Sequence, residues 1–354
     1  MTDMISDELV KDVKIEKKKN KIVSIGLDCG TMNIVCARSD SNDVKLTRNV
    51  FLPLDQDEIS VNELSNISYV KGDDGKLFVI GEDAFKMANI FGHQISRPMK
   101  KGLISSDEIS AMDVLTLIIK DLIGDTKDKE VYCSYSIPAE AIDENRSITY
   151  HTRVFGKILN SLGVNHTPIN EAAAIIYSEC KNEGFSGVGL SFGAGMVNCC
   201  VMYKGVEVLK FSTARSGDWI DENVAQNLGI VQNRVTSTKE KELNLTEGPI
   251  GVKDKKKARV VEALCYYYES LIDYTVKKLI KEFSDKVDIE VDEKLPIVVS
   301  GGTSMPTGFI EMLRDNLTKN NLPFEIKEIR RAKNPMTAVA NGLLIKTLAD
   351  IQNK

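Results

Sequence analysis

Hydrophobic and polar positions along the chain follow the same order twice. In the first half "IVSIGL" (22–27) predicts a buried strand, "DCGT" (28–31) a tight turn, and "NIVCAR" (33–38) the returning strand of a hairpin. In the second half "GVGLSFGAGMVNCCVMYKGVEVLKFS" (187–212) repeats strand, glycine turn and strand, and adds a third strand. The repetition predicts two α/β domains with a cleft between them.

Segments with helical spacing of apolar residues follow each hairpin. They are "AMDVLTLIIKDLI" (111–123), "ITYHTRVFGKILNSLG" (148–163), "EAAAIIYSEC" (171–180), "VVEALCYYYESLIDYTVKKLIKEF" (260–283) and "NPMTAVANGLLIKTLAD" (334–350). We therefore divide the chain into a domain over 21–185 and a second over 186–354. A polar, mixed stretch predicts an inserted subdomain at about 53–94 in the first domain, and we expect the insert of the second domain at about 231–285.

Residues 1–20 look like an appendage to these domains. Their apolar residues form a weak helical stripe among mixed charges, and the segment has no aromatic residue. We interpret it as a solvated tail. A short amphipathic helix that contacts a membrane or a partner is the weaker alternative.

Composition narrows the class of protein. The chain has 354 residues, 42% hydrophobic and 27% charged, as in an ordinary globular protein. Its formal net charge of -5 gives no electrostatic reason to expect nucleic-acid binding. The seven cysteines form no zinc-type pairs and are expected to be reduced and buried, which favours the cytoplasm.

Three glycine turns each follow an apolar strand, at Asp28–Thr31, Gly193–Gly195 and Gly301–Thr303. Glycine lets backbone N–H groups approach an anion without steric hindrance from a Cβ atom. Two facing hairpin turns can hold phosphates from both sides, while the third turn can pack against a nucleoside. None of the turns fits the GxxxxGK[ST] pattern of a Walker-type loop.

The sequences and the order of these motifs resemble those of the actin superfamily, which also contains sugar kinases and the heat-shock chaperone ATPase domain. The matching motifs are "IGLDCGTMNIV", "PINEAAAIIYS", "GLSFGAGMVNCCV" and "VVSGGTSMPTGF". "ISRPMKKGLISSDE" and "LFVIGEDAFKMA" resemble the rod-shape-determining and magnetosome-organising bacterial actins. The resemblance runs from about Ile22 to Leu348. It implies an actin-like fold, with two duplicated α/β domains, a nucleotide cleft and smaller inserted subdomains.

The resemblance also implies a role for individual residues. It implies that ATP, or alternatively GTP, binds with Mg²⁺, which Asp28 would hold through water. It implies that Glu171 orients the attacking water. The residues implied to contact the nucleotide are Gly30, Thr31, Met32, Asn33, Ser191, Gly193, Ala194, Gly195, Lys239, Glu242, Gly301, Gly302 and Thr303. For Lys239 and Glu242, an ordinary exposed helix face is an equally good interpretation.

Two positions depart from the family pattern. Ser191 stands where the second phosphate motif normally has aspartate, and Asn198 replaces an acidic residue or histidine. Serine brings no formal charge to a reaction that depends on positioning and charge, so we expect slow ATP hydrolysis. Three functions stay open: a bacterial or phage actin-like filament protein that self-associates and positions an unknown cargo, a filament protein without hydrolysis, and a monomeric kinase-like or chaperone-like nucleotide switch.

Overall fold

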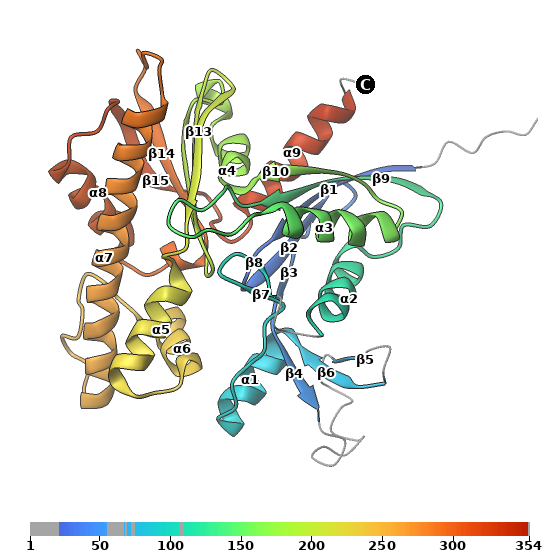
Figure 1. Cartoon of the computed structure of the whole chain (residues 1–354), viewed down its shortest axis with the longest axis horizontal. Helices are drawn as coiled ribbons and strands as arrows, with labels where there is room; N and C mark the ends of the chain where they lie inside the picture. Colours follow the sequence, from blue (N-terminus) through green and yellow to red (C-terminus); the bar gives the residue numbers. More distant parts are fainter. Residues whose placement is uncertain (1–20, 55–66, 68, 72–74, 106–109, 353–354) are drawn as a thin grey trace, which may run out of the picture.

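The computed structural model describes residues 21–54, 67, 69–71, 75–105 and 110–352. Its first half is built on a five-stranded sheet with the strand order β10-β9-β1-β2-β3 (Figure 1). The strands are β1 (Lys21–Cys29), β2 (Asn33–Arg38), β3 (Lys45–Arg48), β9 (Lys129–Ile137) and β10 (Asn165–Asn170). β1, β2 and β3 pair antiparallel, whereas β9 and β10 join them in parallel.

The second half repeats this arrangement with the order β13-β12-β11-β14-β15. Its strands are β11 (Gly187–Phe192), β12 (Val197–Tyr203), β13 (Val206–Thr213), β14 (Leu295–Ser300) and β15 (Ile326–Arg331). Again three antiparallel strands meet two parallel ones. The predicted duplication of α/β domains is therefore confirmed. β3 and β15 were missed because both are polar and half-exposed, which hides their strand pattern.

Helices cover the sheets in layers. α2 (Ala111–Ile123) and α3 (Thr149–Ser161) share a hydrophobic core with the first sheet. α5 (Gly217–Leu228), α6 (Gln232–Glu242), α7 (Lys255–Lys286) and α8 (Phe309–Lys319) share one hydrophobic core with the second sheet, and α6 packs against α5 and α7. α4 (Glu171–Glu179) and α9 (Ala338–Gln352) lie between the two sheets.

Very close contacts hold the two central helices. A Cβ atom at Gly342 in α9 would lie 1.8 Å from the carbonyl oxygen of Ala174 in α4. A Cβ atom at Gly26 in β1 would lie 2.0 Å from the carbonyl oxygen of Ala340. The C-terminal helix therefore packs on the sheet of the first half, and only glycine fits at these two contacts.

A smaller unit projects from the first sheet below β3 in Figure 1. It contains β4 (Phe51–Leu54), β5 (Tyr69–Lys71), β6 (Leu77–Ile80) and α1 (Gly81–Phe91), and β7 (Met99–Lys100) with β8 (Leu103–Ile104) leads back to the main sheet. The predicted tail, residues 1–20, and part of the predicted insert at 53–94 lie outside the described residues. Within the described ranges, no helix is both long and apolar enough to cross a membrane.

Candidate functional site

A cavity of about 770 Å³ lies where the hairpin turns of the two sheets converge. All of the nucleotide-site residues predicted from the sequence line it. They are Asp28, Gly30, Thr31, Met32, Asn33, Glu171, Ser191, Gly193, Ala194, Gly195, Lys239, Glu242, Gly301, Gly302 and Thr303. The fold thus brings together residues from β1, β2, β11, β14, α4 and α6, although their roles stay predictions.

The two hairpin turns approach each other closely. A Cβ atom at Gly195 would lie 2.2 Å from the backbone nitrogen of Gly102 and 2.3 Å from the hydroxyl oxygen of Thr31. Among the described residues, the N–H groups of Thr31, Met32, Ala194 and Gly195 have no hydrogen-bond acceptor. Free N–H groups on facing turns form the concave donor surface that binds anions such as phosphate.

Asp28 lies at the end of β1, where the strand meets the cavity. The Ser136 hydroxyl donates a 2.9 Å hydrogen bond to Asp28 Oδ1 and accepts a 2.7 Å bond from the Cys29 N–H. Burial raises the pKa of Asp28 to about 6, and the Ser136 hydrogen bond opposes that shift. Sequence reasoning missed Ser136. The only hint was a small polar residue at the end of the strand-like "VYCSYSIP".

Glu171 is the first residue of α4, and its partly buried carboxylate is held at both oxygens. Ser191 Oγ donates to Oε1 at 2.5 Å, and Asn198 Nδ2 donates to Oε2 at 3.0 Å. The Ala139 N–H donates to Asn198 Oδ1 at 3.1 Å, which fixes the orientation of the amide. The two residues that depart from the actin-family pattern therefore bind the same carboxylate.

The two carboxylates make the cavity receptive to a divalent cation. Burial raises the pKa of Glu171 to about 8, and the nearby Asp28 carboxylate adds to the shift. Among the described residues, neither Asp28 nor Glu171 has a cationic partner. Carboxylates are the ligands that Mg²⁺ prefers, often through water. The donor set therefore fits the implied cation, with Asp28 nearest to the hairpin turns.

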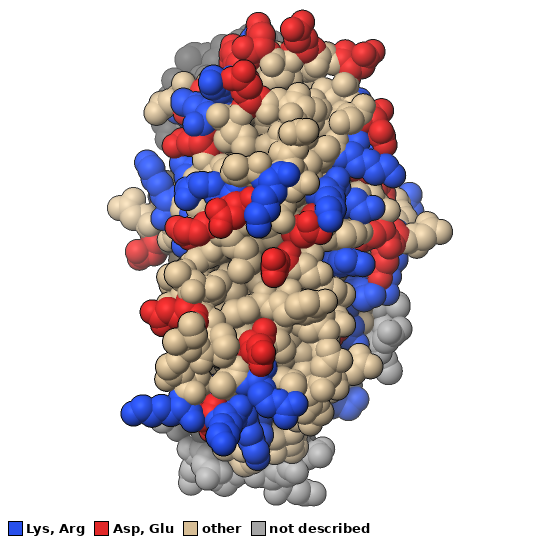
Figure 2. Space-filling model, turned by 90° about the vertical axis from the view of Figure 1, so that its left-hand side faces the viewer, with Lys and Arg blue, Asp and Glu red and all other residues tan. Residues whose placement is uncertain are grey.

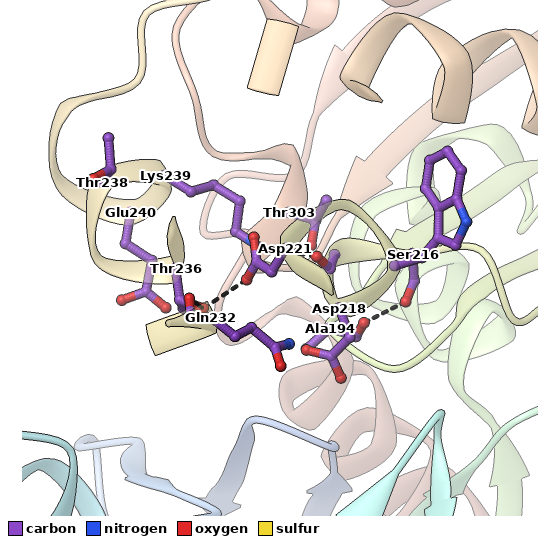
Figure 3. Close-up of polar contacts among 12 residues, drawn as sticks. Ala194, Ser216, Asp218, Asp221, Gln232, Thr236, Thr238, Lys239, Glu240 and Thr303 are labelled. Carbon is purple, nitrogen blue, oxygen red and sulfur yellow. Dashed lines mark hydrogen bonds and ion pairs between the residues drawn. The ribbon is translucent and has the colours of Figure 1, made fainter. Parts of the chain in front are cut away.

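Lys239 lies on the α6 wall of the cavity (Figure 3). Its side chain is buried, and Nζ donates to Asp221 Oδ2 at 2.8 Å and to the Gly217 carbonyl at 3.1 Å. Thr236 Oγ1 donates to the same Asp221 oxygen at 2.7 Å. The alternative of an ordinary exposed helix face is therefore wrong for Lys239. Glu242, in contrast, is exposed and pairs with Lys257 of α7.

The third glycine turn is tied to the second. Thr303 Oγ1 donates to the carbonyl of Gly193 at 2.8 Å. The Asp218 N–H, at the start of α5, donates to the carbonyl of Ala194 at 2.7 Å, and Ser216 Oγ donates to that oxygen too (Figure 3). The carbonyl groups of the second turn are thus engaged within the protein, whereas its N–H groups at Ala194 and Gly195 are not.

Ion pairs join the two halves beside the cavity. Arg97 Nη1 lies 2.7 and 2.8 Å from the two carboxylate oxygens of Asp218, and both side chains are largely buried. At the rim, Arg48 of β3 lies 2.6 Å from Glu240 of α6 and also pairs with Glu82 of α1. The sequence offered no indication of these pairs, because the partners are far apart along the chain.

The architecture matches known proteins along nearly its whole length. A family model described as Volactin matches residues 23–347. A MamK double helical filament superposes with a TM-score of 0.69 at 18% identity, over 93% of this chain and 99% of that chain. MreB5 of Spiroplasma citri bound to ADP gives 0.63 at 14% identity, over 94% and 98%. The ethanolamine utilization protein EutJ from Carboxydothermus hydrogenoformans gives 0.50 at 17% identity, over 91% and 89%. A sequence comparison with curated proteins finds no significant match.

Proposed function

This chain belongs to the Volactin family and has an actin-like fold, and from that premise we propose that it binds ATP with Mg²⁺ in the cavity between its sheets and polymerises head to tail. GTP is the alternative nucleotide. The polymer is expected to act mechanically, by positioning a cargo.

One observation carries the nucleotide proposal: motifs from four distant segments of the chain meet at one cavity of about 770 Å³. The cavity offers free N–H groups for phosphates and two partly buried carboxylates without a cationic partner among the described residues. The similar MreB5 structure was solved with ADP. Bound Mg²⁺ would neutralise phosphate charge, with Asp28 holding it through water and Ser136 orienting Asp28.

The arrangement around Glu171 supports slow hydrolysis. For Glu171 to orient a water molecule, one of its oxygens must accept from that water while both already accept from Ser191 and Asn198. The two bonds leave one acceptor site on each oxygen and so limit the directions from which a water can be held in line. The same geometry favours, as a second candidate, a filament protein that binds nucleotide without hydrolysing it.

Light scattering after addition of Mg-ATP, with phosphate release followed in the same sample, tests the proposal. Scattering that rises and later decays with phosphate release indicates a dynamic filament. A persistent rise without phosphate release indicates the second candidate. Turnover without any rise in scattering would refute polymerisation and favour the monomeric switch.

A variant with a blocked cavity tests whether the nucleotide binds there. Gly195→Val places a side chain where even a Cβ atom would lie 2.2 Å from the Gly102 nitrogen, so it should abolish binding of a fluorescent ATP analogue. Thr318→Ala on α8, whose hydroxyl donates only within its own helix, is the control and should bind normally. Unchanged binding by a folded Gly195→Val variant would rule out this cavity as the nucleotide site.

A further inference from the structure

The third glycine turn forms one wall of the cavity. The residues of this wall are Gly301, Gly302, Thr303, Met305, Pro306 and Thr307. From the sequence we expect this turn to pack against the nucleoside, whereas the two hairpin turns hold the phosphates. The position of the wall therefore governs how well the nucleoside part of the proposed ligand fits.

Both ends of this wall are fixed by neutral hydrogen bonds. At one end, Thr303 Oγ1 donates a 2.8 Å bond to a carbonyl of the second turn. At the other end, the Leu245 N–H donates to the Thr307 carbonyl at 2.8 Å. Met305 and Pro306 lie between these two anchors, so their position depends on a further contact.

Arg331, the last residue of β15, holds the middle of the wall from outside the cavity. Its Nη2 atom donates to the Ser304 carbonyl at 2.7 Å and to the Pro306 carbonyl at 3.3 Å. Ser304 is fully buried, and a buried carbonyl group needs a donor. The residues that line the cavity do not include Arg331 in the described structure. It therefore acts on the wall and not on the ligand.

No other partly buried arginine in the described part of the chain is used in this way. Across the middle of the side that carries α7 and α8, basic side chains lie among acidic ones (Figure 2). The partly buried arginines that pair with carboxylates are Arg38, Arg48, Arg97 and Arg330. Arg215 stacks on the rings of Trp219 and Tyr274. Arg331 makes neither kind of contact with any described residue, so its charge is directed at the carbonyl groups of the wall.

The guanidinium group of Arg331 also carries a cost. Its Nε atom is buried and has no acceptor among the described residues. A buried donor without an acceptor lowers the free energy of unfolding. Hydrogen bonds from a cation are stronger than neutral ones, so the bonds to Ser304 and Pro306 offset this loss and fix the wall firmly.

We propose that Arg331 is a positioning residue for the nucleoside part of the ligand. Through Nη2 it holds the segment from Ser304 to Pro306 in the place where the wall contacts the nucleoside. The phosphate-binding turns do not depend on it. This inference rests on the nucleotide binding proposed above and names a residue that shapes one half of that site.

Two ligands separate the two halves of the site. ADP carries a nucleoside and phosphates, whereas inorganic tripolyphosphate carries phosphates alone. In calorimetric titrations with Mg²⁺, Arg331→Met should bind ADP about tenfold more weakly than the wild type, because it removes the donors behind the wall. Its affinity for tripolyphosphate should be unchanged. Arg331→Lys keeps a cationic donor and should recover most of the loss.

The neighbouring Arg330 supplies the matched control. It lies on the same strand, but its guanidinium contacts Glu179 and Glu328. Successive side chains of a strand point to opposite faces. Arg330→Met should therefore lose these ion pairs and yet bind both ADP and tripolyphosphate as the wild type does.

The outcomes separate this inference from the proposed function. A wild type that binds neither ADP nor ATP would refute both. If the wild type binds ADP and a folded Arg331→Met binds it equally well, the role of Arg331 is wrong and the nucleotide site stands. Equal weakening of ADP and tripolyphosphate also contradicts the role, because Arg331 would then stabilise the whole cavity. If Arg331→Met does not fold, Arg331→Gln, which keeps one neutral donor group, replaces it with the same expectation.

Discussion

Exchanging the partly buried Glu171 carboxylate for an amide probes the electrostatics of the cavity without removing a hydrogen bond. The Ala139 N–H fixes the Asn198 amide, so Gln at 171 must turn its oxygen towards Asn198 and its NH₂ group towards Ser191. The Ser191 hydroxyl accepts as readily as it donates. Glu171→Gln therefore keeps both contacts, and without nucleotide or divalent cation it should be more stable than the wild type at neutral pH.

The size of the effect follows from the pKa. Burial raises the pKa of Glu171 from 4.5 to about 8, and Asp28 adds to the shift. The difference between a pKa of 4.5 in the unfolded state and about 8 in the folded state corresponds to about 5 kcal/mol. Above pH 4.5 the unfolded state releases the Glu171 proton, whereas the folded state keeps this proton until the pH nears 8. The contribution of the retained proton to the free energy of unfolding is therefore complete below pH 4.5 and is lost as the pH rises towards about 8.

Urea unfolding in EDTA between about pH 6 and 7.5 isolates this group when the wild type is compared with Glu171→Gln, because Asp28, with a pKa raised to about 6, is present in both proteins. The free energy of unfolding of the wild type should fall by about 2 kcal/mol relative to Glu171→Gln over that interval. Glu262→Gln, at an exposed position on α7, changes the net charge equally and should leave the pH dependence unaltered. A constant difference between wild type and Glu171→Gln would refute the reasoning.

Two further predictions concern the walls of the cavity. Ser191→Asp should release phosphate from Mg-ATP faster than the neutral control Ser191→Asn, because it restores a carboxylate beside the phosphates. Equal rates of phosphate release would show that Ser191 does not cause the slow hydrolysis. Lys239→Met leaves Asp221 buried without its cation and should lower the free energy of unfolding by about 3–5 kcal/mol in urea titrations. Adding Asp221→Leu should recover most of that loss, and an unchanged urea midpoint for Lys239→Met alone would contradict the buried ion pair.

The sequence alone was sufficient to predict those parts of the site that depend on a local pattern of residues. Apolar strands and glycine turns have strong local signals, and the duplication predicted that the turns would converge. Ser136, Asp221 and the Arg97–Asp218 pair were missed because their importance comes only from contacts with distant residues. The link between Asn198 and Glu171 was missed for the same reason, although both residues had been identified separately.

The position of α9 affects how the protein folds during synthesis. Thr347 Oγ1 lies 3.0 Å from Ile25 O and 2.8 Å from Ser134 Oγ, both on the first sheet. This face of the N-terminal sheet is covered only when residues 338–352 have left the ribosome. Domains that fold in order of synthesis normally finish the first before the second begins. Here the first half cannot complete its packing until the second half has been made, so a nascent chain must carry an uncovered sheet face while the second half is synthesised.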